Sequence, residues 1–500
     1  MQFQLAFIAT LLVVLYAGNV DALPAKRGAG MVSLPLRRVQ QLKRDVHPHI
    51  LMQQHINRSQ RRFARMTGRD GPTDADLVSN LEKRLFLLPS DPKQHGKRYN
   101  IGGTKHTTTS APDLSAASIS TKAQTKEGGS DPIVAATDNA DGVSDVEIEA
   151  LANGGIAFAD TPAADNSIGL DIIANDVGYF ATILLGTPPR EFRVIMDSGS
   201  ADLWVGAEDC DSDTATGCGN HVFLGGISST TFEDSQRPFQ ITYGTGAVVG
   251  TIVRDNLKLA GLSLDGHIFG VAHNESKEFA GNDVAFDGIL GTAQSTLSNQ
   301  KTLTAVESLA QNGLIQDPIT SYKISRLDDQ KNDGVITFGG LDETKFDPST
   351  LVTVDNLSRV GFWEAAMDKI TVDGADTRLT RRTAILDTGT TLILAPDADA
   401  RALHQAIPGA RSDGQGGFII PCTTNATIAL TFGGREFTID PRDLVFAPLN
   451  LNDPTGDCFS GITSGSIGGA NQWLVGDVFL KSAYFSHNVK TNSMSLAALA

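Results

Sequence analysis

The 500-residue sequence is short of several features that would point to common classes of protein. It has only four cysteines, none in a CxxC pair, so it offers no typical zinc site. It has no excess of basic residues: the formal net charge of -16 at pH 7 argues against a nucleic-acid partner. After residue 22 no run is long and apolar enough for a membrane helix. The C-terminus lacks the hydrophobic tail of a lipid-anchor signal, so we expect no membrane partner.

The one long apolar run lies at the N-terminus, over residues 5–17. It is too short to span a bilayer and is followed by the small-residue spacing Val20-Asp21-Ala22. We therefore predict a secretory signal over residues 1–22 and a protein that is secreted or vacuolar. In an exported chain the four cysteines suggest two disulfides, for which three connectivities exist. The simplest joins Cys210 to Cys218 and Cys422 to Cys458.

Charge is distributed unevenly along the chain. Residues 23–98 carry 16 lysines and arginines against 6 aspartates and glutamates, whereas the rest is strongly acidic. A basic arm can lie along an acidic cleft, although a disordered tail without an inhibitory role would have the same composition. Dibasic pairs favour a removable pro-segment over residues 23–98; they are Lys26-Arg27, Lys43-Arg44, Lys83-Arg84 and Lys97-Arg98.

Residues 99–167 form a low-complexity stretch, which we interpret as a linker or the end of the pro-segment. From residue 168 onward, short apolar stretches bounded by Gly, Pro, Asn and Asp recur, a pattern typical of an all-β protein. Helical periodicity is confined to short pieces such as residues 303–312 and 398–407. We expect an N-terminal lobe over residues 168–326 and a C-terminal lobe over residues 327–500.

An internal repeat supports two lobes. VIMDSGSADLWV, at residues 194–205, returns as AILDTGTTLILA, at residues 384–395. In each copy an apolar strand ends on an aspartate, Asp197 or Asp387, and far downstream of each lie two apolar residues and a glycine. A buried carboxylate needs a compensating group or a chemical role. Two lobes related by an approximate twofold axis would bring the two aspartates together.

Six motifs occur in the order found in the pepsin-like aspartic proteases, and the chain resembles that family from residue 177 to 500. They are YFATILLGTPPREFRVIMDSGSADLWV, ITYGTG, FDGILG, GFWEAAMDKITVDG, AILDTGTTL and WLVGDVFL. The resemblance implies an all-β, bilobal pepsin-like fold with two pseudo-twofold-related β lobes and the active-site cleft between them. It also implies disulfides at both cysteine pairs. The expected function is a monomeric, secreted aspartic endopeptidase, made as a zymogen, that hydrolyses peptide bonds of proteins at acidic pH without cofactor or metal.

The resemblance also assigns roles around the two aspartates. Ionising both of two close carboxyl groups is unfavourable, so Asp197 and Asp387 are expected to share one proton. One of them accepts a proton from water while the other donates a proton to the scissile carbonyl. Glycines allow tight turns, and hydroxyls lock the loops or bond the carboxylates. These supporting residues are Ser198, Gly199, Ser200, Thr388, Gly389 and Thr390. The first motif is DSG where the family more usually has DTG, but serine keeps the hydroxyl.

The segment ITYGTG matches the flap that closes over substrate in this family. Tyr243, Gly244, Thr245 and Gly246 would form it. Trp204 matches the tryptophan that donates a hydrogen bond to the flap tyrosine, and ordinary core packing is its alternative role. In the expected mature part, Asn274, Asn356 and Asn425 lie in Asn-x-Ser/Thr tripeptides and are predicted glycosylation sites.

Two other functions are less consistent with the sequence. A non-catalytic binding protein on the same fold would typically lack a dyad carboxylate, its glycine or the flap, all of which are present. A serine or metal hydrolase would need a GxSxG or HExxH motif, and neither occurs. His47, His49 and His55 lie in the expected pro-segment, where we expect a solvated basic surface.

The pro-segment is expected to act as an intramolecular inhibitor, in competition with protein and peptide substrates. Its stretch MVSLPLRRVQQLKR resembles the basic pro-regions of the family. Basic residues such as Arg61, Arg62 and Arg65 would pair with carboxylates near neutral pH, and acid would weaken the pairing. Lys97 is a candidate for a lysine that caps the dyad directly.

Overall fold

The structure is a computed structural model of the whole chain. It describes residues 32–39, 48–86, 156–157, 159–160, 167–173, 178–212, 217–243, 246–281, 284–326, 329, 331–450, 453, 455–465 and 469–500. The predicted signal segment, Lys97 and most of the predicted linker lie outside these residues. The domain limits that depend on them stay predictions.

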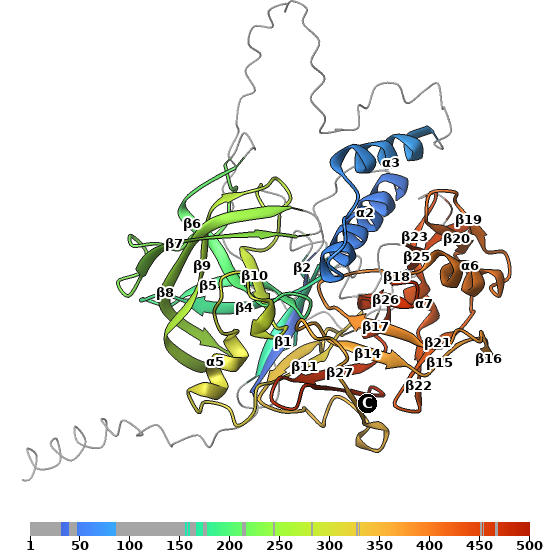
Figure 1. Cartoon of the computed structure of the whole chain (residues 1–500). Helices are drawn as coiled ribbons and strands as arrows, with labels where there is room; N and C mark the ends of the chain where they lie inside the picture. Colours follow the sequence, from blue (N-terminus) through green and yellow to red (C-terminus); the bar gives the residue numbers. More distant parts are fainter. Residues whose placement is uncertain are drawn as a thin grey trace, which may run out of the picture.

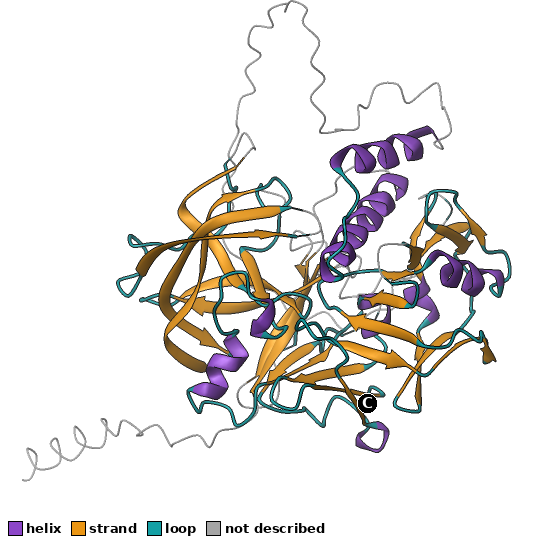
Figure 2. Cartoon of the chain, in the orientation of Figure 1, coloured by secondary structure: helices purple, strands orange, loops and turns teal. Residues whose placement is uncertain are grey.

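Strands are the predominant secondary structure of the described chain and helices are few (Figure 2), which confirms the all-β prediction. Fifteen of the described strands belong to one large sheet that runs through both lobes. They are β1 (Val32–Val39), β2 (Ile156–Ala157), β3 (Ser167–Ile173), β4 (Gly178–Leu185), β5 (Arg190–Asp197), β6 (Leu203–Ser212), β7 (Glu233–Thr242), β8 (Ala247–Leu259), β9 (Leu262–Glu275), β10 (Gly288–Gly291), β11 (Ile319–Lys323), β12 (Val335–Phe338), β13 (Val352–Asp355), β27 (Tyr484–Asn488) and β28 (Ser493–Ala497).

Three smaller sheets build the C-terminal lobe. The first holds β14 (Glu364–Met367), β17 (Arg382–Leu386), β18 (Ile393–Ala395), β25 (Ile462–Ser464) and β26 (Gln472–Val475). The second holds β15 (Lys369–Val372), β16 (Ala375–Asp376), β21 (Ile428–Phe432) and β22 (Arg435–Ile439). The third holds β19 (Arg411–Ser412), β20 (Phe418–Pro421), β23 (Val445–Pro448) and β24 (Asp457–Ser460).

The helices are few and mostly short. They are α2 (Pro48–Met66), α3 (Asp74–Phe86), α5 (Ala305–Gln311), α6 (Asp397–Gln405), α7 (Pro441–Leu444) and α8 (Asp477–Leu480), with 3₁₀ turns η2 (Ser295–Leu297) and η3 (Pro348–Thr350). Helices α5 and α6 confirm the two helical pieces predicted from periodicity. None of these described helices is both long and apolar enough to cross a membrane.

The sequence repeat corresponds to a repeated strand arrangement, one copy in each lobe (Figure 1). In the N-terminal lobe β5 runs parallel to β10, which pairs antiparallel with β6. In the C-terminal lobe β17 runs parallel to β26, which pairs antiparallel with β18. Each motif aspartate thus follows a central, buried strand, and its downstream apolar-apolar-glycine segment is the neighbouring strand. The duplication in sequence is a duplication of architecture.

The large sheet joins the lobes through strands far apart in sequence. Its order passes from β27 through β11 and β12 to β1, β3, β4 and β5. Strand β1, from the predicted pro-segment, therefore lies between β12 and β3. The predicted lobe boundary after residue 326 falls between β11 and β12, which pair antiparallel. This hairpin belongs to the sheet that both lobes share.

Helix α2 lies between the two lobes, and α3 packs against it (Figure 1). The buried apolar residues of α2 recur at helical spacing, so one face of this helix is apolar. Phe63 and Met66 pack with Phe362, Ile385 and Leu474. Further along α2, Met52 and Ile56 pack with Leu392 and Phe459. Because these partners belong to the C-terminal lobe, apolar contacts hold α2 against that side of the cleft.

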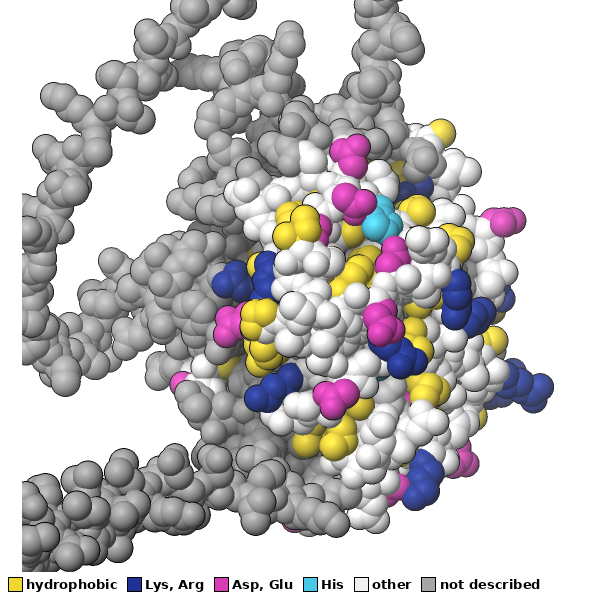
Figure 3. All heavy atoms as spheres, turned by 90° about the vertical axis from the view of Figure 1, so that its left-hand side faces the viewer, with side chains coloured by type: hydrophobic (Ala, Val, Ile, Leu, Met, Phe, Trp, Pro, Cys, Tyr) yellow, Lys and Arg dark blue, Asp and Glu magenta, His cyan; other side chains and the backbone are white. Residues whose placement is uncertain are grey.

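On the outer face of the N-terminal lobe, basic and acidic side chains are interspersed (Figure 3). The three tryptophans, Trp204, Trp363 and Trp473, are all buried in the interior.

Candidate active site

The aspartates Asp197 and Asp387 occupy equivalent turns and are almost completely buried. The Oδ1 atom of Asp197 accepts a hydrogen bond from Gly199 N at 2.9 Å, and its Oδ2 accepts one from Ser200 Oγ at 2.6 Å. Asp387 repeats the pattern with Gly389 N at 2.9 Å and Thr390 Oγ1 at 2.6 Å. Each turn therefore orients its own carboxylate.

Reciprocal hydrogen bonds join the two turns. Ser198 Oγ donates to Leu386 O at 3.1 Å, and Thr388 Oγ1 donates to Met196 O at 2.8 Å. Each hydroxyl also accepts the backbone N–H of the other residue at 2.9 Å. All four groups are buried, so breaking one bond would leave a polar group unpaired at a cost of about 1–3 kcal/mol. The pairing holds the turns of the two lobes face to face.

The glycines of the two motifs are required because the opposite carboxylate lies so close. A Cβ at Gly199 would overlap Oδ1 of Asp387, and one at Gly389 would overlap Oδ1 of Asp197. A methyl group at either position would therefore push the carboxylates apart. This explains why Asp-hydroxyl-Gly occurs in both copies of the repeat.

Arg62, on α2, reaches into the space between the two carboxylates. Its Nη2 donates to Oδ1 of Asp197 and, at 2.7 Å, to Oδ1 of Asp387, while its Nε donates to Oδ2 of Asp387. The side chain is 8% exposed. A planar guanidinium can form this forked contact, whereas an ammonium presents a single point charge. One nitrogen atom in contact with both carboxylates is direct geometric support for their proximity.

The charges of this trio are strongly interdependent. Burial alone lowers the pKa of Arg62, but Asp197 and Asp387 outweigh it and hold that pKa above its ordinary value. Burial raises the pKa of the Asp387 carboxyl; Arg62 acts against this rise and Asp197 adds to it. Arg62 therefore stays charged, and any change of charge with pH must come from the carboxyls.

Sequence reasoning placed Arg62 among the basic residues facing carboxylates but offered Lys97 as the cap of the dyad. In the structure the contact is made by Arg62. The sequence holds only a partial signal: Arg62 precedes Phe63, which lies on the apolar face of the helix, and this does not show that the arginine reaches the dyad. Lys97 lies outside the described residues.

The expectation of a solvated histidine surface in this segment is wrong for His55. Its ring lies against Phe446, with the centroids 5.0 Å apart, and the residue is 5% exposed. Burial, with a contribution from Arg58, lowers the pKa of His55 to about 3. The cause is the packing of α2 on the C-terminal lobe. His49 also contacts an aromatic ring there, that of Phe459.

The predicted flap segment ITYGTG joins β7 to β8 in the sequence. Trp204 Nε1 donates to the hydroxyl of Tyr243 at 2.7 Å, as the resemblance implies, and both rings also contact Phe279. Gly246 O accepts from Tyr243 N. The predicted flap residues Gly244 and Thr245 lie outside the described residues.

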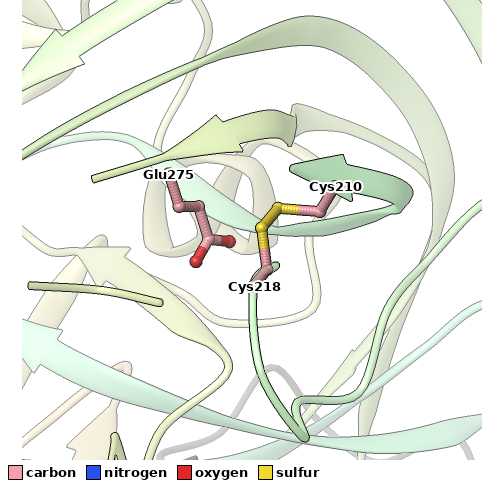
Figure 4. Close-up of side chains that lie close together, drawn as sticks. All are labelled: Cys210, Cys218 and Glu275. Carbon is pink, nitrogen blue, oxygen red and sulfur yellow. A yellow bond between two sulfur atoms is a disulfide. The ribbon is translucent and has the colours of Figure 1, made fainter. Parts of the chain in front are cut away.

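Both cysteine pairs are bonded as the simplest connectivity predicts. Cys210 is joined to Cys218 and Cys422 to Cys458, with Cα atoms 5.9 and 4.9 Å apart. Beside the first disulfide lies the carboxyl of Glu275 (Figure 4). Two thiols and a carboxylate could ligate a metal, but these sulfur atoms are bonded to one another. This cluster therefore does not provide a metal site in the disulfide form.

The three predicted glycosylation sites differ in exposure. Asn274 and Asn425 are exposed and remain predicted sites. Asn356 is buried, and its Nδ2 donates to Phe362 O at 2.8 Å and to Asn492 Oδ1 at 3.0 Å. A glycan would replace one of the two hydrogens of that nitrogen, so at least one of these buried hydrogen bonds would be lost. The structure therefore speaks against Asn356 as a glycosylation site.

Comparisons with known proteins agree with this geometry. The model of the family described as eukaryotic aspartyl protease matches residues 178–499, and the chain belongs to that family. It is 37% identical over 342 residues to the "Probable aspartic-type endopeptidase CTSD" of Trichophyton verrucosum, covering 68% of this chain and 65% of that protein. It is 33% identical over 330 residues to the "Aspartic-type endopeptidase ctsD" of Aspergillus fumigatus, covering 66% and 67%. To "Pepsin A" of Sus scrofa it is 31% identical over 345 residues, covering 68% and 86%. The chain thus spans about two thirds of the length of these two fungal relatives.

Glu275 should make the stability of the fold depend on pH. Its carboxyl is buried, and neither oxygen has a hydrogen-bond partner among the residues that the structure describes. Burial, with a contribution from Asp287, raises the pKa of Glu275 from 4.5 to about 8. An acid whose pKa is raised by folding stabilises the fold fully below its unfolded pKa, and that stability is lost as pH rises towards the folded pKa.

We expect Glu275→Gln, which stays neutral, to raise the free energy of unfolding near pH 7.5 by on the order of 3 kcal/mol and to change it little near pH 4. Denaturant unfolding at both pH values measures this. The exposed Glu278→Gln is the control and should show no such difference. An equal effect of Glu275→Gln at both pH values would contradict the prediction.

Proposed function

We propose that this protein is an aspartic endopeptidase in which Asp197 and Asp387 activate water for hydrolysis of peptide bonds. The observation that carries the proposal is the contact of one guanidinium nitrogen with both carboxylates. Two carboxylates that lie so close together can also hold one water molecule between them. The fold and the family support the same reaction.

In the proposed mechanism the dyad carries a single proton once Arg62 has left. Two like charges in a buried site repel, so one carboxyl stays protonated while the other is ionised. The ionised member accepts a proton from water, and the protonated member donates one to the carbonyl oxygen of the scissile bond. Hydrogen bonds from Ser200 and Thr390 would hold the two carboxyls in place during this exchange.

We further propose that substrates present large apolar side chains next to the scissile bond. Phe63 and Met66 of α2 occupy an apolar surface formed by Phe362, Ile385 and Leu474, close to the dyad. Removal of α2 would open this surface to a substrate. Burying an apolar side chain there would contribute about 1.5–3 kcal/mol to binding.

Replacing either dyad member should abolish hydrolysis. We expect Asp197→Asn and Asp387→Asn each to lower kcat by about 10³-fold or more at acidic pH, because an amide cannot exchange the proton. Cleavage of denatured haemoglobin by the acid-treated chain, with and without pepstatin, measures this. Asp399→Asn is the control, since Asp399 is also a buried carboxylate but pairs with Arg382 away from the dyad.

Cleavage that survives in both dyad variants would mean that the chemistry is different. Absence of cleavage by correctly processed wild type would instead favour a binding protein on this fold.

We also propose that the chain is a secreted zymogen, with residues 23–98 as its inhibitory segment. Arg62 fills the space between the carboxylates, and α2 covers the apolar surface beside them. Substrate and α2 could not occupy this place together. The predicted signal segment and the two disulfides favour an oxidising compartment.

Acid should release this segment, because two protonation effects both weaken the docking of α2 as pH falls. Arg62 stabilises the ionised dyad, so docking of α2 is favoured while the carboxyls are ionised and is lost as they become protonated. His55 must be neutral when docked, because burial holds its pKa at about 3 instead of 6.5. Docking therefore weakens as pH falls from 6.5 towards 3, by on the order of 3 kcal/mol near pH 4 for His55.

Loss of the arginine should relax the inhibition. We expect Arg62→Gln to process itself, or to bind an active-site ligand such as pepstatin, at a pH at which the wild-type chain does neither. Tryptophan fluorescence and gel analysis across a pH series would follow both. Arg61→Gln is the matched control, because Arg61 lies on the same helix but donates to Pro72 O at 3.3 Å. Identical behaviour of Arg62→Gln and wild type would contradict inhibition through the dyad.

Loss of the histidine should act in the opposite direction. His55→Phe keeps the contact with Phe446 but cannot take up a proton, so we expect activation to require a lower pH than in wild type. His267→Phe is the control. Its histidine is buried with a pKa of about 4, but it lies on β9, away from α2. If both variants shifted the activation pH equally, the effect would reflect general acid stability and not release of α2.

A further inference from the structure

Thr292 follows β10 directly, and each of its three polar groups contacts a different part of the molecule. Its N–H donates to Asp197 O at 2.8 Å. Its hydroxyl shares a hydrogen bond of 2.5 Å with the hydroxyl of Tyr322. Its carbonyl accepts from Trp363 Nε1 at 3.3 Å. The residue is 1% exposed, so none of these bonds competes freely with water.

The partners of Thr292 lead to the other aspartate. Trp363 O accepts from the N–H of Leu386, at 2.9 Å, and Leu386 immediately precedes Asp387. The Tyr322 hydroxyl also interacts with Thr388, the residue that follows Asp387. Thr292 thus connects the backbone of Asp197 in one lobe with both neighbours of Asp387 in the other. These connections are separate from the Ser198–Thr388 contacts.

Aromatic packing keeps the two partners of Thr292 in place. The ring of Tyr322 is stacked with Phe485, with the centroids 5.9 Å apart and the planes at 14°. The ring of Trp363 is stacked with His487 at 4.3 Å and 19°. All four side chains are buried. This packing therefore fixes the Tyr322 hydroxyl and the Trp363 indole N–H at the positions where they contact Thr292.

We propose that Thr292, acting through Tyr322 and Trp363, is a positioning residue that sets the placement of the Asp197 carboxyl relative to the Asp387 carboxyl. This inference rests on the proposed catalytic role of the dyad. Proton exchange through one water requires both carboxyls to be held within a fraction of an ångström, and a displacement of 1 Å can cost about 10²-fold in rate. The Thr292–Tyr322 hydroxyl pair, together with the hydrogen bond from Trp363 of the C-terminal lobe to Thr292 O, supplies such a constraint.

A purely structural role makes a different prediction, so the two can be separated. Two buried hydroxyls that satisfy each other can be replaced together by apolar groups at little cost in stability. If the pair only fills the core, the double variant Thr292→Val/Tyr322→Phe should be stable and fully active. If the pair positions the dyad, that variant should be stable but slow.

The test uses the full chain, activated by acid, with Thr292→Val, Tyr322→Phe and the double variant. We expect each single variant to lower kcat by about 10-fold, with KM changed less than about twofold, and to shift the pH profile of kcat/KM. The double variant should be no slower than the slower single variant, because both remove the same interaction. Its thermal midpoint should be close to that of wild type.

Tyr484→Phe is the matched control. Tyr484 is a buried tyrosine of the same sheet, on β27, and its hydroxyl accepts from Asp342 N at 2.8 Å without contact to the dyad. It should lower the thermal midpoint and leave kcat and the pH profile unchanged.

Two results would overturn the inference: Thr292→Val and Tyr322→Phe behaving like Tyr484→Phe, or additive losses of rate in the double variant. Full activity of Asp197→Asn would refute the proposed function itself, which is a separate and recognisable outcome.

Discussion

The structure depends on holding two carboxylates of the same charge side by side in a buried site. Such a pair is unfavourable unless donors compensate it. Here each carboxylate accepts bonds from its own turn, and reciprocal hydroxyl–backbone bonds hold the turns together. The glycines after Ser198 and Thr388 leave room for the opposing carboxylate. The twofold repetition of the strands is what allows two equivalent turns to meet in this way.

The remaining charge is compensated by a part of the chain distant in sequence. Arg62 enters on α2, and its guanidinium contacts both carboxylates. The position of the helix is set by apolar packing of Met52, Ile56, Phe63 and Met66 against the C-terminal lobe. The ion pair and the packing therefore support each other. Neither the opposite charges of the two chain regions nor the amphipathic helix alone would direct one arginine to this point.

Buried titratable groups outside the site give the molecule two opposed responses to acid. Burial favours the protonated form of Glu275, so acid stabilises the fold of the N-terminal lobe around it. His55 is buried in its neutral form, so acid disfavours the docking of α2. The same fall in pH would thus stabilise the N-terminal lobe and weaken the docking of α2. Both responses are compatible with the proposal that acid releases the inhibitory segment from the folded enzyme.

The sequence by itself determined the all-β class, the two aspartates and the two short helices α5 and α6, because a duplicated motif and local spacing carry that information. It left three connectivities open for the cysteines and favoured the simplest, which is the one observed. Only the tertiary structure decided that Arg62 contacts the dyad and that His55 is buried instead of solvated. It also decided that the side chain of Asn356 is buried and hydrogen-bonded, which speaks against glycosylation there. It also revealed that Thr292 connects both aspartate loops. These four facts depend on which surfaces pack together across long sequence separations. Local pattern cannot give them, because burial and the direction of a hydrogen bond are properties of the packed lobes and not of any one segment.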